Sequence, residues 1–196
     1  MSHIIPLPFS PLTSVLKVII PLRSQLPVLS SQGNHTSQLS TLNSQLEKLF
    51  HIAYLGLGTN LGNKKANLRK AIKKIGERVG TVERQSAFYE TEPWGFRSDN
   101  MFVNAVVRVS TQLTPMQLLR TTQQIERDMG RRKNLSVSSS PGEPRAYHDR
   151  PIDIDILLYD DWTVDEPELK IPHPLMQERD FVMVPLREII DEDQVP

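Results

Sequence analysis

The chain has 196 residues, of which 38% are hydrophobic and 23% charged, with a formal net charge of zero and no cysteine. This length suits one ordinary domain with additional segments. Zero net charge argues against binding nucleic acid or an anionic membrane through bulk charge. The lack of cysteine excludes disulfides, a thiolate nucleophile and cysteine-ligated metal centres, and fits a reducing compartment such as the cytoplasm. No apolar run approaches the roughly 20 residues that cross a bilayer.

Residues 1–50 differ in composition from the rest of the chain. Ser, Leu, Pro and Gln dominate, Glu47 is the only acidic residue, and prolines interrupt any helix that the apolar residues could begin. A secretory signal would need a basic start and an unbroken apolar middle, and a transit peptide would need more arginine than Arg23. We expect a disordered or spurious extension over residues 1–50 and the functional domain over 51–196. A targeting role or a short amphipathic helix over residues 39–50 is the alternative.

Beyond residue 50, alternation of apolar and polar residues predicts a set of β-strands. In residues 101–110, every second residue from Val103 to Val109 is apolar, which places these side chains on one face. The predicted strands span residues 52–57, 82–90, 101–110 and 152–159.

Two helices are predicted between these strands. Apolar residues at helical spacing run from Leu68 to Val79, and Gly80 follows where a helix commonly ends. Thr114, with Gln117 three residues later, forms a capping box that begins the second helix, which ends at Gly130. The order strand, helix, strand, strand, helix, strand predicts an α+β ferredoxin-like sandwich, a mainly antiparallel sheet with one layer of packed helices.

The glycine-rich turn after the first strand, residues 56–63, matches no nucleotide fingerprint. In G-x-G-x-x-G the third glycine would fall on Leu61, and Gly62 comes one place too late. The Gly-Lys-Ser/Thr of a P-loop is also missing. The turn either serves only to connect strand and helix, or presents backbone N–H groups with Thr59 and Asn60 to a polar ligand.

The segment Pro151-Ile152-Asp153-Ile154-Asp155-Ile156 carries a carboxylate pair. Strand alternation places Asp153 and Asp155 on one face, about 7 Å apart along the strand. Two like charges on one face of a strand require compensation. Magnesium prefers one or two carboxylates together with nucleotide phosphates, and a pair of such ions can serve phosphate transfer. By itself the pattern is equally explained by the solvated face of an edge strand.

Basic residues crowd the segment that precedes the carboxylate pair, and only Glu143 and Asp149 oppose them. We expect a mobile loop that brings cations to a triphosphate and excludes water when it closes. A solvated charged loop is the alternative, but cations next to metal-binding carboxylates are what a metal–nucleotide site requires. The basic residues are Arg131, Arg132, Lys133, Arg145 and Arg150.

Several stretches together resemble 6-hydroxymethyl-7,8-dihydropterin pyrophosphokinases, over about residues 52–190. The Arg-x-x-Asp-x-Asp-Ile block and the later Pro-His are the most specific of them. The matching stretches are residues 58–61, 86–91, 102–105, 125–131, 150–156 and 171–174, followed by Arg179, Phe181 and Pro185-Leu186.

This resemblance implies transfer of the diphosphate of ATP to 6-hydroxymethyl-7,8-dihydropterin, with release of AMP, in folate biosynthesis. It implies ATP as co-substrate and two Mg²⁺ ions on Asp153 and Asp155. The implied pterin residues are Gly58, Thr91, Glu92, Trp94, Phe102, Asn104 and Phe181. The implied ATP residues are Gln123, Glu126, Arg131, Lys133, Tyr147, Arg150, Ile156, Leu169, Lys170, His173 and Arg179, among which Arg131, Arg150 and His173 are the catalytic ones.

The residues alone leave two of these roles open. Taken alone, His173 between two prolines favours a structural role, and Glu126 indicates a surface position on an amphipathic helix. The resemblance also implies a cytoplasmic monomer that uses small-molecule substrates, without nucleic acid or membrane. The two alternative functions are a ferredoxin-like RNA-binding module, which would want exposed aromatic residues on its central strands, and a nicotinamide-binding oxidoreductase.

The chain departs from the family pattern at several positions. Tyr147 stands in place of a usual loop Trp, and Lys133 in place of a second loop Arg, which replaces a guanidinium fork by a point charge. Trp94 and Phe102 replace a smaller apolar residue and a Tyr. The loop before the carboxylate pair is longer than expected, and the chain stops at Pro196, earlier than many relatives. None of these changes removes a predicted metal ligand.

Overall fold

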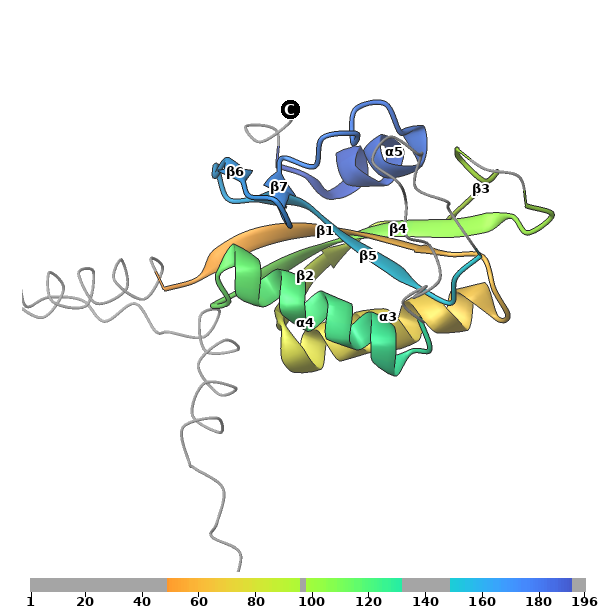
Figure 1. Cartoon of the computed structure of the whole chain (residues 1–196), viewed down its shortest axis with the longest axis horizontal. Helices are drawn as coiled ribbons and strands as arrows, with labels where there is room; N and C mark the ends of the chain where they lie inside the picture. The colour runs from red at the N-terminus through yellow and green to blue at the C-terminus, as the bar shows by residue number, and fades with distance from the viewer. Residues whose placement is uncertain (1–48, 96–97, 132–148, 192–196) are drawn as a thin grey trace, which may run out of the picture. The chain divides into compact units, whose positions relative to one another are not determined.

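The computed structural model describes residues 49–95, 98–131 and 149–191, all within a compact unit of residues Gln45–Pro196 (Figure 1). Most of the predicted N-terminal extension and most of the predicted loop, including Lys133 and Tyr147, lie outside these residues. No helix in the described part of the chain is long and apolar enough to cross a membrane.

One antiparallel sheet forms the centre of the fold. Its order is β2-β4-β1-β5, with β3 also paired to β4, so that β5 is an edge strand. A separate hairpin of two short strands precedes the last helix. The strands are β1 (His51–Thr59), β2 (Gly80–Gln85), β3 (Tyr89–Thr91), β4 (Phe102–Thr111), β5 (Asp153–Tyr159), β6 (Val164–Asp165) and β7 (Lys170–Ile171).

Two helices cover one face of the sheet, α3 (Lys64–Arg78) and α4 (Pro115–Asp128), as Figure 1 shows. The predicted capping box of α4 is confirmed: the Thr114 side chain accepts from Gln117 N–H, and the Gln117 side chain accepts from Thr114 N–H. Asn63 caps α3 by accepting from the N–H of Ala66 at 3.1 Å. These elements and their order confirm the α+β ferredoxin-like prediction.

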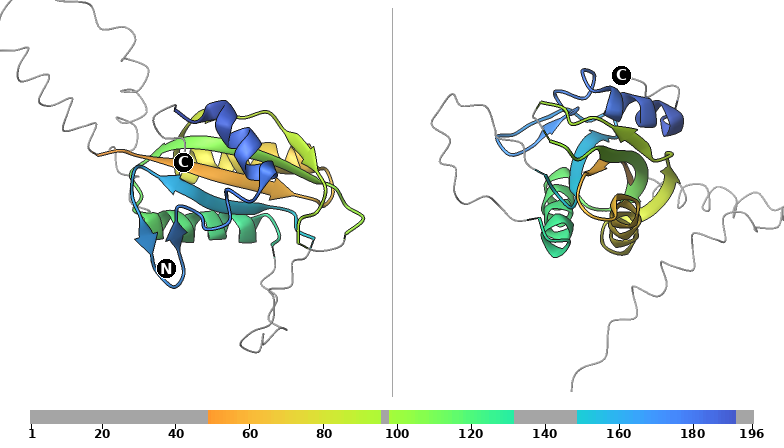
Figure 2. Two further views of the ribbon diagram at one scale, coloured as in Figure 1. Left: turned by 90° about the horizontal axis from the view of Figure 1, so that it is seen from above. Right: turned by 90° about the vertical axis from the view of Figure 1, so that its right-hand side faces the viewer.

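The prediction of a single helix layer was wrong. A third helix, α5 (Asp180–Ile189), packs on the opposite face of the sheet (Figure 2). Its buried side chains, Val182, Met183, Leu186 and Ile189, contact the sheet residues Tyr54, Val106 and Leu157. Local pattern did not reveal this helix, because Pro185 lies inside it and no side chain caps its start.

The predicted strand over residues 82–90 was also wrong, because two strands, β2 and β3, occupy that region. Ser86 lies between them and continues the pairing with β4 through its side chain. Its backbone N–H donates to Val106 O at 2.9 Å, and its Oγ accepts from Val106 N–H at 2.9 Å. A hydroxyl thus replaces a backbone carbonyl, which a hydrophobic pattern cannot reveal.

The alternation predicted for β5 is confirmed and positions the carboxylate pair. Ile152, Ile154 and Ile156 are buried in the core beneath α3 and α4. Asp153 and Asp155 therefore project to the opposite side of this edge strand, toward the face that carries α5.

Candidate active site

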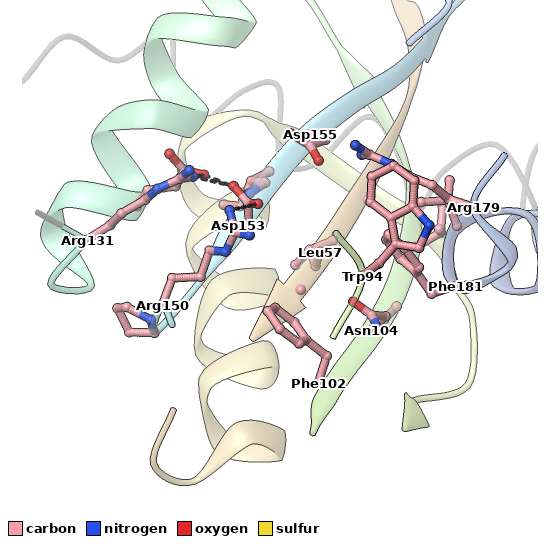
Figure 3. Close-up of a pocket in the computed structure, with 18 of the residues that line it drawn as sticks. Leu57, Trp94, Phe102, Asn104, Arg131, Arg150, Asp153, Asp155, Arg179 and Phe181 are labelled. Carbon is pink, nitrogen blue, oxygen red and sulfur yellow. Dashed lines mark hydrogen bonds and ion pairs between the residues drawn. The ribbon is translucent and has the colours of Figure 1, made fainter. Parts of the chain in front are cut away.

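A cavity of about 760 Å³ lies along the edge strand β5, between α4 and the start of α5. Strands β1 and β4, the connection between β3 and β4, and the segment before α5 complete its wall. Figure 3 shows an ionic half with Arg131, Arg150 and Asp153, and an aromatic half with Trp94, Asn104 and Phe181. The fold therefore brings together residues as far apart in the chain as Gly56 and Val182, which are separated by 126 positions.

Most of the predicted site residues line this one cavity. They are Gly58, Thr91, Glu92, Trp94, Phe102, Asn104, Gln123, Glu126, Arg131, Arg150, Asp153, Asp155, His173, Arg179 and Phe181. Three predicted ATP residues do not: Ile156 and Leu169 are buried in the core, and Lys170 is exposed and ion-paired with Asp165. Thr59, considered for a polar ligand, is fully buried and also lies outside the cavity lining.

Asp153 is the centre of the ionic half. Arg150 donates from Nη1 to Asp153 Oδ2 at 2.7 Å, and Arg131 donates from Nη1 to Asp153 Oδ1 (Figure 3). The same Nη1 of Arg131 also contacts Glu126 Oε1. Two guanidinium groups thus converge on one carboxylate, so Asp153 is electrostatically compensated.

Asp155 has a different environment. The ion pairs that surround this part of the cavity reach Asp153 and Glu126, and among the described residues none reaches Asp155. Burial, reinforced by the negative charge of Asp153, raises the pKa of Asp155 to about 7. A carboxylate held in this way is stabilised by any cation that enters the cavity.

Glu126 is buried, with 6% of its surface exposed, which corrects the interpretation of a surface position on α4. Its Oε1 accepts from the outward-facing N–H of Ile154 at 2.8 Å, so α4 satisfies a backbone donor of the edge strand. Burial raises the pKa of Glu126 to about 7 against the opposing charge of Arg131. Glu126 therefore contacts both the Arg131 side chain and the backbone of β5.

The aromatic half contains a fixed amide. Asn104, on β4, is 5% exposed and donates from Nδ2 to Thr91 Oγ1 at 2.8 Å. Gly58, opposite it on β1, leaves room for the amide oxygen: a Cβ at this position would lie 2.9 Å from Asn104 Oδ1. The amide therefore has a defined orientation and offers its oxygen as an acceptor.

Aromatic rings and a guanidinium group surround this amide. The Arg179 guanidinium carbon lies 4.6 Å from the Trp94 ring centroid and 5.8 Å from that of Phe181. The two rings are 6.3 Å apart between centroids. Across the cavity, the Arg150 guanidinium carbon lies 5.8 Å from the Phe102 ring centroid. Such surfaces suit a flat heterocycle that can stack and accept or donate hydrogen bonds.

His173 lies on the cavity wall after β7. Its backbone N–H donates to Leu157 O at 2.9 Å, and its Nδ1 faces the N–H of Leu175 at 3.3 Å. In that arrangement Nδ1 accepts, so the neutral ring carries its proton on Nε2. Burial and the positive charge of Arg179 lower the pKa of His173, which favours this neutral, donating form at pH 7.

The sequence interpretation gave no site role to Asp149, and it considered its partner Asn60 only as a contact for a polar ligand. Asp149 lines the cavity and accepts from Asn60 Nδ2 at 2.6 Å. Asp149 directly precedes Arg150, and this adjacency was the one available signal, although it was interpreted only as a charge opposing the basic cluster. Asn60 does not face a ligand as considered, because its side chain is engaged by Asp149 and Arg150.

An antiparallel α+β fold with carboxylates, arginines and a stacking slot in one cavity is typical of a transferase that handles a nucleotide phosphate and a flat polar acceptor. The comparison with known sequences names the family. A family model described as 7,8-dihydro-6-hydroxymethylpterin-pyrophosphokinase (HPPK) matches residues 54–191, and the chain belongs to that family.

Curated relatives agree with this assignment. The chain is 48% identical over 139 residues to the 2-amino-4-hydroxy-6-hydroxymethyldihydropteridine pyrophosphokinase of Porphyromonas gingivalis, covering 70% of this chain and 90% of the relative. It is 38% identical over 136 residues to the enzyme of the same name from Aquifex aeolicus, covering 69% and 78%. The Bacillus subtilis enzyme is 36% identical over 143 residues, covering 72% and 80%.

Solved structures support the fold. The wild-type Plasmodium falciparum HPPK-DHPS with pteroate superposes with a TM-score of 0.55 at 17% identity. The match covers 73% of this chain and 41% of that chain, so this chain spans less than half of the solved protein.

The family and its relatives establish the activity. The chain is an ATP-dependent pyrophosphokinase that transfers diphosphate from ATP to 6-hydroxymethyl-dihydropterin in folate biosynthesis. The alternative functions gain no support: the antiparallel sheet is not the parallel one of a nicotinamide-binding fold, and the relatives are named as pyrophosphokinases.

Proposed function

We propose that the transfer takes place in the cavity along β5, with two Mg²⁺ ions held by Asp153 and Asp155. The observation that carries this proposal is the partly buried Asp155 carboxylate, which lies on the same side of β5 as Asp153 and has no ion-pair partner among the described residues. The described residues contain no group of three or more His, Cys, Asp or Glu side chains placed to hold a metal ion. Two carboxylates nevertheless fit Mg²⁺, which takes its remaining ligands from phosphate oxygens and water.

The nucleotide half of the cavity is proposed for the region of Arg131, Arg150 and His173. When bound, the metal ions neutralise the triphosphate and favour attack on its β-phosphorus. Both arginines contact Asp153 in the structure. We expect both guanidinium groups to bind the phosphate oxygens of ATP, because guanidinium forks bind phosphate well. The proton on Nε2 of His173 is available to the α-phosphate or the leaving oxygen.

The pterin half is proposed for the slot between β1, β4 and the start of α5. The fixed Asn104 amide can accept from a ring N–H, and the rings of Trp94 and Phe181 supply stacking surfaces. Gly58 keeps the slot open beside the amide. We expect the hydroxymethyl group of the pterin to point toward the ionic half, which belongs to the same cavity.

We further propose that residues 51–196 form the catalytic domain and act as a cytoplasmic monomer on small molecules alone, without nucleic acid or membrane. The net charge of zero does not favour binding to polyanions. Ile156, Leu169 and Lys170 remain predicted ATP neighbours, through backbone rather than side chain. Light scattering of the purified chain at several concentrations would reveal any dimer.

The decisive experiment supplies ATP, Mg²⁺ and 6-hydroxymethyl-7,8-dihydropterin and measures AMP by mass spectrometry, with and without pterin. We expect pterin-dependent AMP. ADP as the product would contradict diphosphate transfer. The metal assignment is tested with Asp155→Asn alongside Asp161→Asn, an exposed carboxylate outside the cavity lining. Only Asp155→Asn should lose turnover, and equal activity of both variants would refute the metal assignment.

A further inference from the structure

Asp149 joins three separate segments at the cavity edge. Its Oδ1 accepts from Asn60 Nδ2 at 2.6 Å and from Ser98 Oγ at 2.7 Å. Its Oδ2 accepts from Asn100 Nδ2 at 2.7 Å. Asn60 belongs to the turn after β1, whereas Ser98 and Asn100 belong to the connection between β3 and β4. One carboxylate therefore holds together segments that are otherwise distant in the chain.

Asn60 in turn fixes the backbone of the next residue, Arg150. Its Oδ1 accepts from Arg150 N–H at 2.8 Å, and its own backbone N–H donates to Arg150 O at 3.3 Å. Asn60 is 1% exposed and thus well immobilised. A residue whose backbone is bracketed in this way projects its side chain in a restricted direction, which for Arg150 leads to Asp153 and the Phe102 ring.

The Asp149 carboxylate is charged under physiological conditions. Hydrogen bonds from Ser98, Asn100 and Asn60, together with the positive charge of Arg150, lower the pKa of Asp149. Hydrogen bonds to an ionised acceptor are stronger than those between neutral groups. Through these contacts, Asp149 links the β3–β4 connection, to which Trp94 belongs, to the backbone at Arg150.

We propose that Asp149, supported by Asn60, is a positioning residue that couples the two halves of the cavity. The link ties the β3–β4 connection, which forms part of the pterin half, to Arg150 in the nucleotide half. Ordering of either half by its substrate restricts the other, so each substrate strengthens binding of the other by the same factor. This inference rests on the proposed placement of pterin and ATP in the two halves.

The test measures binding by calorimetry on the full chain, with Mg²⁺ and an ATP analogue that carries a methylene group between the α- and β-phosphorus and so cannot react. The dissociation constant of 6-hydroxymethyl-7,8-dihydropterin is determined without and with saturating analogue, and their quotient is the coupling ratio. We expect a ratio of about fivefold or more for the unmodified chain. Asp149→Ala should bring the ratio close to one.

Removing the same contacts from the other side gives an independent check. The variant Ser98→Ala/Asn100→Ala should lower the ratio as Asp149→Ala does, and combining all three changes should add little, because the same link is already broken. The matched control is Asp99→Asn, which changes a carboxylate on the same connection that forms no hydrogen bond or ion pair with the described residues. It should leave the ratio unchanged.

The outcomes separate the alternatives. A structural role alone would lower the melting temperature and weaken both substrates without changing the ratio, which would overturn the proposal. A coupling ratio of one in the unmodified chain, or an unchanged ratio in Asp149→Ala, would also overturn the coupling proposal. Neither result would contradict the proposed positions of ATP and pterin in the cavity. If the folded chain binds neither compound, the placement of the substrates is wrong and the coupling falls with it.

Discussion

Asp155→Asn is expected to stabilise the metal-free protein at alkaline pH while it removes turnover. The two effects have one cause, because the partly buried carboxylate next to Asp153 is unfavourable for folding and is the one proposed to hold the metal. Asparagine has nearly the same shape but no charge. The substitution therefore separates electrostatic from packing effects at this position.

The magnitude follows from the pKa. A rise in the pKa of Asp155 from 3.8 to about 7 corresponds to about 4 kcal/mol at about 1.4 kcal/mol per pH unit. Because Asp155 is only partly buried, solvent screens part of this effect, and we expect about 1–3 kcal/mol for this residue. The folded protein binds the proton more tightly than the unfolded chain, so its stability falls as the pH rises from about 4 to about 7 and then stays low.

The assay is urea denaturation in EDTA at pH 5 and pH 8. We expect the unmodified chain to lose stability between the two, and Asp155→Asn to lose less and to be the more stable protein at pH 8. Mg²⁺ with ATP should restore stability to the unmodified chain alone, since ligands stabilise the state they bind. Turnover of the variant should fall at least about a hundredfold, as for loss of other transition-state charge stabilisation.

Two results would refute this reasoning. A variant that is less stable than the unmodified chain at pH 8 in EDTA would mean that the carboxylate is stabilised by protein contacts and not strained by burial. A variant with near-normal turnover would mean that Asp155 does not hold an essential metal ion.

Three further outcomes are expected. Gly58→Ala should raise the KM for pterin about tenfold and change the KM for ATP less, because the new Cβ would lie 2.9 Å from the Asn104 side-chain oxygen and displace this hydrogen-bonding group. Equal changes in the two KM values would contradict this expectation. Thr111→Val should lower the free energy of unfolding, measured by urea denaturation, by about 1–3 kcal/mol, because the buried Thr111 hydroxyl donates to one backbone carbonyl and accepts from one backbone N–H. Turnover at saturating substrate should not change. Pterin binding should quench the fluorescence of Trp94, and the quenching should survive Trp162→Phe but not Trp94→Phe, because only Trp94 lines the cavity.

The sequence predicted those parts of the fold that local pattern controls. The alternation of Ile and Asp in β5 requires only the two-residue period of a strand, and the capping box at Thr114 requires only four consecutive residues. Both are confirmed. The third helix was missed because its signal depends on packing: Pro185 weakens its local pattern, and burial against Tyr54 and Val106 supplies what the local sequence lacks.

For the candidate site, the sequence also predicted one part, the identity of the residues, and not the other, the environment of each side chain. Resemblance in short motifs identified residues that the fold then gathers in one cavity, from Gly58 to Phe181. The environment of each residue could not be predicted, because it depends on partners far away in the chain. By its helical position alone Glu126 indicated a surface residue, although the resemblance implied an ATP-binding role. In the structure it is buried against the backbone of Ile154, 28 residues later.

By itself, the sequence determined the order of the predicted strands and helices, the face on which Asp153 and Asp155 lie, and the family. These are properties of neighbouring residues or of motifs read in order. Only the tertiary structure decided which charges are compensated: two guanidinium groups converge on Asp153 and none pairs with Asp155 among the described residues. It also decided that Asn60 meets Asp149 across 89 positions of the chain. Such contacts depend on how the sheet closes and what it buries, since electrostatic energies follow distance and solvent exposure in space rather than separation in sequence.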